Sequence, residues 1–301
     1  MNTSGELLQY LAARAYRDAI ENDDIKINQG RILAEMNRGK TSRNLADYEF
    51  KVFSQWGEDG ILQRLVERIP LAERTFIEFG VEDFGESNCR FLMMKDNWRG
   101  FVIDGSERNV AAIRSAYYYW RYDLTAVSAF ITRENIDDLL AQSGFGEDLG
   151  ILSIDIDGND YHVWEAISGF RPRIVICEYN AVFGAERKIS VPYHPRFQRT
   201  VKHHSNLYFG ASLAALAYLG RRKGYTLVGT GSAGANAFFV RDDLMTGDFA
   251  ALTPEAAYHP SRFRESRDAE GQLTFVGGED RLALIAGMPV IDVETGEMGE
   301  L

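Results

Sequence analysis

The connection between the last two apolar runs of the main domain constrains the fold most strongly. One run covers 226–228, the other covers 237–240, and the short segment GTGSAGANA joins them. Because a crossover between parallel strands needs a dozen or more residues, these runs are expected to pair as an antiparallel hairpin. From Phe53 onward, short apolar runs alternate with helical stretches, which is the pattern of βαβ units. The sequence therefore predicts a doubly wound, mainly parallel α/β sheet of seven strands that ends in an antiparallel hairpin.

The same patterning predicts the remaining elements and the domain boundaries. Further strands are expected at 75–79, 100–103, 126–130, 150–154 and 173–177. Helices are expected at 57–68, 89–94, 133–141, 161–167 and 212–223. The main domain is expected over 46–245, after a helical N-terminal extension at 1–45 and before a C-terminal extension at 246–301 with a hairpin near 273–276.

The N-terminal extension is predicted to form two helices, at 6–21 and 25–36. Apolar residues recur along the first of them, at Leu7, Leu8, Leu11 and Ala15. A stripe of this kind is expected to bury itself against another surface. We expect it either to join copies of the chain in a homo-oligomer or to form a lid at the substrate entrance.

Bulk composition argues against several classes of protein. The net charge of −11 opposes binding to nucleic acid, whose backbone is recognised by clustered Lys and Arg. No apolar run approaches the roughly 20 residues of a membrane span, and the first residues lack the features of a secretory signal. We therefore expect a cytoplasmic protein without a membrane partner. Cys89 and Cys177 lie far apart in the sequence, so reduced thiols are expected rather than a disulfide or a zinc site.

A glycine turn and an acidic residue follow the first two expected strands. Glu78 ends the first strand, Gly80 turns the chain, and Asp104 ends the second strand. Ligands of open α/β sheets bind at the carboxyl ends of the strands, where an acid can accept hydrogen bonds from both ribose hydroxyls of an adenosine. A dinucleotide needs a glycine-rich phosphate cradle, whereas this turn carries Glu82 and Asp83. S-Adenosylmethionine has no phosphate and carries a sulfonium and an ammonium group, so it is the expected cofactor.

Oxygen-bearing side chains follow the fourth and fifth expected strands. The segment IDIDGND supplies Asp155 and Asp157, and the segment CEYN supplies Glu178 and Asn180. Because neighbouring strands end at the same edge of a sheet, these side chains are expected to converge. Carboxylate and amide oxygens suit Mg²⁺ or a similar divalent cation. Asp160 is expected instead to cap the helix that follows.

Several of these segments together resemble a known family. Across about residues 50–245 the chain is similar to FkbM-type and related class I S-adenosylmethionine-dependent methyltransferases, in the segments FSQWGEDGIL, FIEFGVEDFGESN, GFVIDGS, LSIDIDGNDYHVWEAI and CEYN. The resemblance implies a class I methyltransferase fold. It also implies that the cofactor is lined by Gln55, Glu78, Gly80, Asn88, Asp104 and Ser106. Glu82 stands where the family pattern has its second glycine.

The acidic residues resemble a feature of certain O-methyltransferases. Catechol-type and macrolide-sugar enzymes hold a divalent cation between an acid after strand four and an acid and amide after strand five. The matching residues here are Asp155 or Asp157, with Glu178 and Asn180. Such a cation positions a hydroxyl group and lowers its pKa. His204, in the loop after the fifth strand, is expected to remove the hydroxyl proton, with Asp155 as a second catalytic residue.

The expected function is therefore metal-assisted O-methylation of a small hydroxylated molecule, such as a sugar or a natural product. One alternative is a metal-dependent glycosyltransferase that binds a nucleotide sugar through the Asp-x-Asp pattern of Asp155 and Asp157. Another is a binding protein that keeps the fold without catalysis. Binding of S-adenosylmethionine would favour the methyltransferase over both alternatives.

Overall fold

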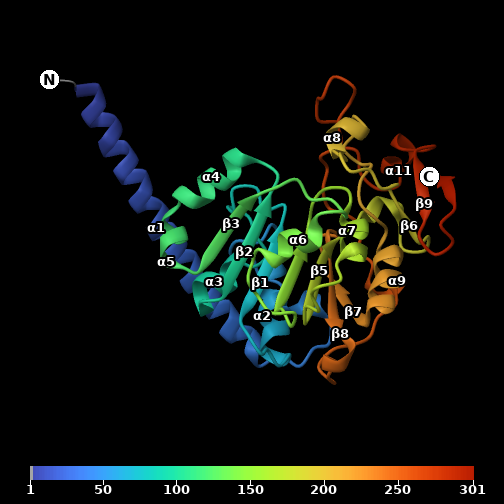
Figure 1. The fold of residues 1–301 in the computed structure, drawn as a ribbon, viewed down its shortest axis with the longest axis horizontal. Helices are drawn as coiled ribbons and strands as arrows, with labels where there is room; N and C mark the ends of the chain where they lie inside the picture. The colour runs from blue at the N-terminus through green and yellow to red at the C-terminus, as the bar shows by residue number, and fades with distance from the viewer. Residues whose placement is uncertain (1–2) are drawn as a thin grey trace.

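A seven-stranded sheet forms the centre of the computed structural model, which describes residues 3–301 (Figure 1). Its strands are β1 Thr75–Phe79, β2 Arg99–Asp104, β3 Leu124–Ser128, β4 Ile151–Ile154, β5 Ile174–Glu178, β7 Tyr225–Thr230 and β8 Asn236–Arg241. They lie in the order β3-β2-β1-β4-β5-β8-β7. Strands β1 to β5 are parallel, and β8 is antiparallel to β5 and β7. The predicted fold class, a doubly wound sheet ending in an antiparallel hairpin, is confirmed.

Helices cover both faces of this sheet. The longer ones are α1 Thr3–Arg38, α2 Glu58–Arg68, α3 Arg90–Asp96, α4 Glu107–Ser115, α6 Ile136–Ala141, α7 Asp160–Ala166 and α9 Leu213–Lys223. Short helices and turns are η1 Leu45–Tyr48, α5 Tyr117–Arg121, η2 Ala181–Phe183, α8 Arg199–Lys202, η3 Asp242–Leu244, α10 Pro254–Ala257 and α11 Asp280–Leu284. The helix expected from 133 begins only at Ile136, because Asn135 Oδ1 accepts the amide of Thr132 (2.8 Å) and closes a turn there.

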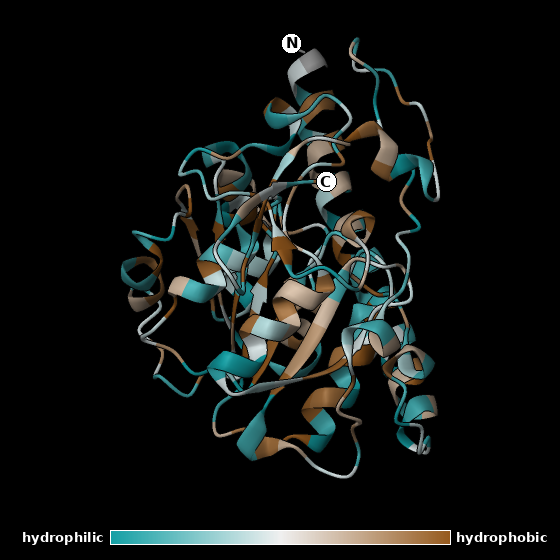
Figure 2. Ribbon diagram, turned by 90° about the vertical axis from the view of Figure 1, so that its right-hand side faces the viewer, coloured by the Kyte–Doolittle hydropathy of each residue, from teal (hydrophilic) through white to brown (hydrophobic). Residues whose placement is uncertain are grey.

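The seven-stranded sheet has one hydrophobic cluster on each face. In β2, Val102 packs into the cluster under α1 to α4, whereas Phe101 and Ile103 pack into the cluster under α6, α7 and α9. Both faces of a parallel sheet are buried in this way, which explains why its strands read as continuous apolar runs. Figure 2 shows this distribution, with hydrophobic residues in the central strands and hydrophilic residues on much of the outer surface.

The N-terminal extension contains one continuous helix instead of the two expected. Asp23, in the expected break, is buried and anchors the middle of α1 to the domain. Its Oδ2 atom forms an ion pair with Arg90 Nη2 (2.5 Å) and accepts a hydrogen bond from the Tyr117 hydroxyl (2.6 Å). This tertiary contact outweighs the weak helix propensity of the local sequence.

The first turns of α1 project away from the sheet (Figure 1). Leu7, Leu8 and Leu11 are exposed there, so the expected apolar stripe has no cover within residues 3–301. Over the same residues, none of the helices combines the length and the apolar composition that a membrane span requires. The expectation that this stripe joins copies of the chain stays a prediction.

The C-terminal extension pairs with the main domain through a second sheet. Strands β9 Pro289–Asp292 and β10 Met298–Glu300 form a hairpin, and β9 also pairs with β6 Ile189–Ser190. Near the hairpin predicted at 273–276, the chain forms a short antiparallel bridge between Arg267 and Leu273 rather than two full strands. A two-stranded pair of this length needs a packed face, which β9 obtains by burying Val290 beside β6.

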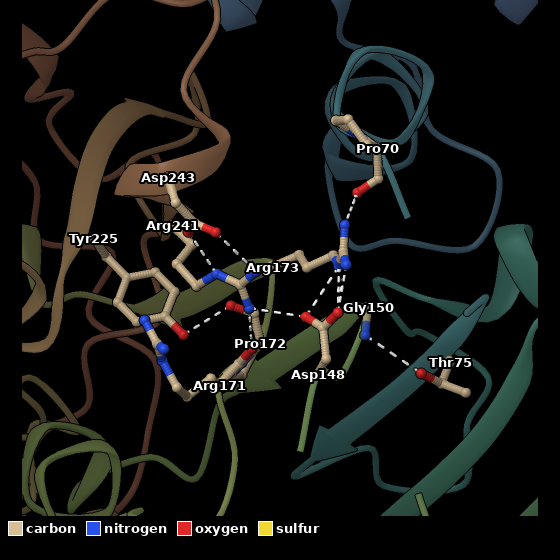
Figure 3. Close-up of polar contacts among 10 residues, drawn as sticks. All are labelled: Pro70, Thr75, Asp148, Gly150, Arg171, Pro172, Arg173, Tyr225, Arg241 and Asp243. Atoms are coloured by element: carbon tan, nitrogen blue, oxygen red, sulfur yellow. Dashed lines mark hydrogen bonds and ion pairs between the residues drawn. The ribbon is translucent and has the colours of Figure 1, made fainter. Parts of the chain in front are cut away.

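A network of ion pairs joins the strands at the amino ends of β4 and β5 (Figure 3). Asp148 Oδ1 accepts hydrogen bonds from Arg173 Nε (3.0 Å), just before β5, and from Arg241 Nη1 (2.8 Å), at the end of β8. Arg241 Nε also donates to Asp243 (2.7 Å). The two arginine side chains are only 13% and 10% exposed, whereas Asp148 is 43% exposed. The carboxylate thus balances two nearly buried charges and ties the antiparallel strand to β5.

We predict that Asp148→Asn lowers the free energy of unfolding by about 1–3 kcal/mol, because it leaves the nearly buried Arg173 guanidinium without an ion pair while the site stays partly screened by solvent. Its hydrogen bonds with Arg173 and Arg241 hold the pKa of Asp148 below the ordinary 3.8. The stabilisation is therefore present above the unfolded-state pKa and is lost as the pH falls through the lower folded-state pKa. Urea unfolding at several pH values measures both effects.

The matched control is Asp123→Asn, which removes the ion pair with Arg99 on the surface. Both of those side chains are more than half exposed, so this change should cost less than about 1 kcal/mol. Equal effects of the two substitutions would contradict the assignment of the Asp148 network as a stabilising clamp.

Candidate functional site

A cavity of about 440 Å³ opens at the carboxyl ends of β1, β2, β4 and β5, a size typical of small-molecule sites. Nine of the residues predicted for the site line it: Gln55, Glu78, Gly80, Asn88, Asp104, Asp155, Asp157, Glu178 and Asn180. Its charged lining within residues 3–301 consists of eight acidic residues and two arginines: Glu78, Glu82, Glu86, Asp104, Asp155, Asp157, Glu178, Glu265, Arg199 and Arg281. The cavity therefore favours a cationic ligand over an anionic one at most of its wall.

Gly80 brings the turn after β1 into contact with the turn after β4. Its φ is +66°, and a Cβ atom at this position would lie 1.6 Å from the carbonyl oxygen of Asp155. Only glycine fits this approach. The glycine that the sequence marked as a candidate for cofactor contact is thus required by the backbone, whatever the ligand.

Glu78 and Asn88 shape the cavity wall beside this turn. The Glu78 carboxylate accepts hydrogen bonds from Ser87 Oγ (2.6 Å) and from the amides of Asn88 (2.7 Å) and Cys89 (3.2 Å). Burial raises the pKa of Glu78 to about 7, against the effect of these hydrogen bonds. Asn88 Nδ2 donates to Ser153 Oγ (3.1 Å) on β4. These two residues position the start of α3 against β1 and β4.

Asp104 organises the backbone at the end of β2. Its Oδ2 atom accepts the amide of Glu82 (2.9 Å), and its Oδ1 atom accepts the amide of Ser106 (2.8 Å) and the Asn109 side chain (3.1 Å). A carboxylate has about four acceptor positions, so one remains for a ligand. Ser106, which the resemblance placed at the cofactor, does not line the cavity, because its hydroxyl accepts the Asn109 amide (3.3 Å) and caps α4.

Asp155, Asp157 and Glu178 form a compact group, called here the acidic trio. One carboxylate oxygen from each lies within 4.8 Å of the others. Burial, followed by repulsion between neighbouring carboxylates, raises the pKa of Asp155 and of Glu178 well above the usual range. Glu178 Oε2 is buried and has no hydrogen-bond partner in the described chain. Three converging carboxylates with an unsatisfied oxygen fit a hard divalent cation.

Asn180 is held by backbone groups beside the trio. Its Nδ2 atom donates to the carbonyls of Leu207 and Phe209 (both 2.9 Å), and its Oδ1 atom accepts the amide of Val182 (3.0 Å). The side chain therefore fixes the 207–209 segment against η2. Its carbonyl oxygen is already engaged, and Asp157 Oδ1 pairs with Arg199 Nη1 (2.7 Å), which leaves Asp155 and Glu178 as the freer ligands.

Asp160 lies behind the trio and outside the lining of the cavity. Its carboxylate accepts the amides of Ile156 (2.8 Å) and Gly158 (2.9 Å). These amides belong to the loop that precedes α7, so Asp160 closes that loop rather than capping later helix amides as expected.

Arg199 is a site residue that the sequence did not reveal. Its Nη1 atom pairs with Asp157 Oδ1 (2.7 Å), its Nη2 atom pairs with Glu265, and its guanidinium lies 3.9 Å from the centre of the Phe209 ring. A single arginine at the start of the short helix α8 has no sequence pattern that would distinguish it. The ion pair links the trio to the C-terminal extension across the cavity.

The C-terminal extension contributes four residues to the cavity: Ser261, Phe263, Glu265 and Arg281. The Phe263 ring packs edge-on against Trp56, with ring centres 5.3 Å apart. Trp56 belongs to the segment before α2, so two distant parts of the chain meet at this wall. No local signal predicted this contribution.

His204, predicted as the catalytic base, does not line the cavity. It is exposed, and its ring stacks on His203 with ring centres 4.3 Å apart. The surrounding loop reaches the cavity instead through Phe197, Arg199 and the 207–209 segment. His204 thus lies on the surface outside the cavity, and its role as the catalytic base stays a prediction.

Comparisons with known proteins found no matching family model and no matching curated protein. Solved structures with a related shape include an O-methyltransferase from Bacillus cereus in complex with SAH, at 14% identity, TM-score 0.39, and coverage of 71% of this chain and 88% of the other. A putative O-methyltransferase from Klebsiella pneumoniae shares 12% identity, with TM-score 0.37 and coverage of 75% and 89%. A S-adenosylmethionine-dependent methyltransferase from Clostridium acetobutylicum shares 6%, with TM-score 0.38 and coverage of 61% and 90%. Similarity at this level does not define the activity of this chain.

The raised pKa of Glu178 predicts a pH-dependent effect of Glu178→Gln in buffer that contains a chelator. Between the ordinary pKa of 4.5 and the raised value, the folded protein keeps a proton that the unfolded chain releases. The stability of the natural protein should therefore fall as the pH rises above about 4.5, and the variant should lose less stability, because it lacks the contribution of Glu178 but keeps those of other buried acids such as Glu78. Urea unfolding should show the variant to be the more stable protein at the highest pH values of the series.

Glu86→Gln is the matched control, because Glu86 also lines the cavity but is 60% exposed and pairs with Lys51 (3.2 Å). Glu86→Gln should produce no comparable gain in the free energy of unfolding at the highest pH values. A stability difference between Glu178→Gln and the natural protein that is constant with pH would contradict protonation of Glu178.

Proposed function

We propose that this chain is an S-adenosylmethionine-dependent methyltransferase that transfers a methyl group to the hydroxyl of a small molecule. The observation that carries the proposal is the acidic cavity, which has Asp104 at the end of β2 and a tight glycine turn at the end of β1. This is the place where open α/β sheets bind nucleoside ligands. One acceptor position of Asp104 is left for a ribose hydroxyl.

The charge of the cavity favours S-adenosylmethionine over a dinucleotide. Glu82 and Glu86 line the turn after β1, and the amide of Glu82 is already donated to Asp104. A pyrophosphate would meet carboxylates here instead of the free amides and helix N-terminus that usually bind it. The sulfonium and ammonium groups of S-adenosylmethionine are positive, so the same carboxylates attract them.

The acidic trio supports transfer to oxygen. Its three carboxylates, with the unsatisfied Glu178 Oε2, provide the donor set for a divalent cation such as Mg²⁺. A bound cation would supply Lewis-acid stabilisation of the developing alkoxide. Within residues 3–301 no histidine lines the cavity, so Asp155 and Glu178 are the proton acceptors in this proposal. Burial and mutual repulsion raise the pKa of both groups, and a bound cation would oppose this effect and favour the ionised carboxylates that accept the proton.

We predict that the protein binds S-adenosylhomocysteine in calorimetry and that Asp104→Ala weakens this binding. Loss of hydrogen bonds to a charged group should cost about 1.5–3 kcal/mol, or roughly 10- to 150-fold in Kd. Ser106→Ala is the control, because Ser106 caps α4 outside the cavity. An unchanged affinity in folded Asp104→Ala protein, or tighter binding of NAD, would overturn the assignment. Saturable binding of a nucleotide sugar instead would favour the glycosyltransferase alternative.

We also predict that methyl transfer requires a divalent cation. In a screen of hydroxylated acceptors, chelation should abolish product formation and added Mg²⁺ should restore it. Glu178→Gln should lower turnover and weaken Mg²⁺ binding at least tenfold, while the affinity for S-adenosylhomocysteine stays unchanged, because the trio lies at β4 and β5. Glu86→Gln should leave Mg²⁺ binding unchanged. Full activity after exhaustive chelation would contradict the cation requirement.

A further inference from the structure

Two arginines line the cavity, and they differ in how their charge is balanced. Arg199 pairs with Asp157 and Glu265. Arg281 is 7% exposed and has no ion pair within residues 3–301. Its side chain makes one hydrogen bond, from Nη2 to the carbonyl of Ser261 (2.7 Å), and its Nε atom is buried without a partner.

An uncompensated buried guanidinium is costly, because the loss of hydration is not offset by a nearby negative charge. The acidic residues of the cavity do not provide that charge, since none lies within 4.0 Å of Arg281. A guanidinium presents a planar set of donors that matches a carboxylate or a phosphate in bidentate geometry. The missing partner of Arg281 is therefore an anionic oxygen group supplied by a ligand.

Arg281 lies on the side of the cavity away from the expected nucleoside site. It belongs to α11, which contacts η2, the turn that directly follows β5 and Asn180. Gly80 and Asp104 lie on β1 and β2, and β4 stands between β1 and β5 in the sheet. The acidic trio, at the ends of β4 and β5, lies between these two sides. The position of Arg281 thus points to the methyl acceptor rather than to the nucleoside.

We propose that the acceptor carries a carboxylate or phosphate group and that Arg281 binds this group. The inference rests on the proposed methyltransferase function for the identity of the ligand as the acceptor. Carboxylates elsewhere in the cavity repel an anion, so the acceptor has one favourable orientation. Phe263 and Val182 also line the cavity, and they would contact the apolar part of the molecule. The hydroxyl of the acceptor then faces the acidic trio.

Three probes that share a phenyl group test this proposal: benzoate, phenyl phosphate and benzyl alcohol. Each is titrated at constant ionic strength into the full chain, with and without S-adenosylhomocysteine, and binding is measured by calorimetry. We expect at least one anionic probe to bind saturably and at least tenfold more tightly than benzyl alcohol. Tighter binding of benzoate identifies a carboxylate acceptor, and tighter binding of phenyl phosphate identifies a phosphate acceptor.

The variant Arg281→Gln should weaken binding of the anionic probe at least tenfold and leave the affinity for benzyl alcohol unchanged. Arg281→Lys should recover part of the affinity for the anionic probe. Arg262→Gln is the matched control, because Arg262 also belongs to the C-terminal extension, is exposed and does not line the cavity. Urea unfolding establishes that each variant is folded. If Arg281→Gln fails to fold, the comparison of natural protein with Arg281→Lys carries the test.

Several outcomes would overturn the proposal. They are the absence of saturable binding by both anionic probes at millimolar concentrations, and equal affinities in the natural protein and in folded Arg281→Gln. A loss of S-adenosylhomocysteine affinity in Arg281→Gln without a change in probe affinity would assign Arg281 to the carboxylate of the cofactor. Failure of the natural protein to bind S-adenosylhomocysteine would overturn the methyltransferase proposal separately, because the probes are also titrated without it.

Discussion

The cavity depends on a direct backbone contact between the turns after β1 and β4. Gly80 approaches the carbonyl oxygen of Asp155 so closely that no side chain fits between them. This contact places the end of β1, where the nucleoside is proposed to bind, against the start of the acidic trio. A larger residue at 80 would separate these turns and widen the cavity at its centre. One glycine therefore brings the proposed nucleoside site and the acidic trio together.

Opposing electrostatic effects act on the carboxylates around this contact. Glu78 is satisfied by backbone amides and the Ser87 hydroxyl, and Asp104 uses three of its about four acceptor positions on the backbone and on Asn109, so both hold the loops in place. Glu178 keeps a buried oxygen without a partner, and its neighbours repel its charge. Structural and reactive acids are thus distinguished by their hydrogen bonds, although both kinds lie at strand ends. This difference is the reason for assigning chemistry to the trio and a positioning role to Glu78.

The C-terminal extension completes the site from outside the sheet. Glu265 reaches the trio through Arg199, Phe263 packs on Trp56, and Arg281 lies on the wall beside η2. Strand β9 anchors the same extension to β6. The sheet provides the strand ends at which the cofactor is proposed to bind, whereas the extension adds four residues to the wall of the cavity. A shared fold can therefore serve different acceptors through variation outside the sheet.

The sequence by itself determined the sheet, its terminal hairpin and the acids at the strand ends. These features depend on local patterns: buried strands are apolar, connections have minimum lengths, and strand ends carry ligand residues. Only the tertiary structure decided which acids stay free and which bind backbone amides. It also turned His204 away from the cavity and brought Arg199 and Arg281 to its wall. The physical reason is that loops and extensions have no periodic pattern, so contacts between distant residues, such as Asp157 with Arg199, arise only when the chain is packed.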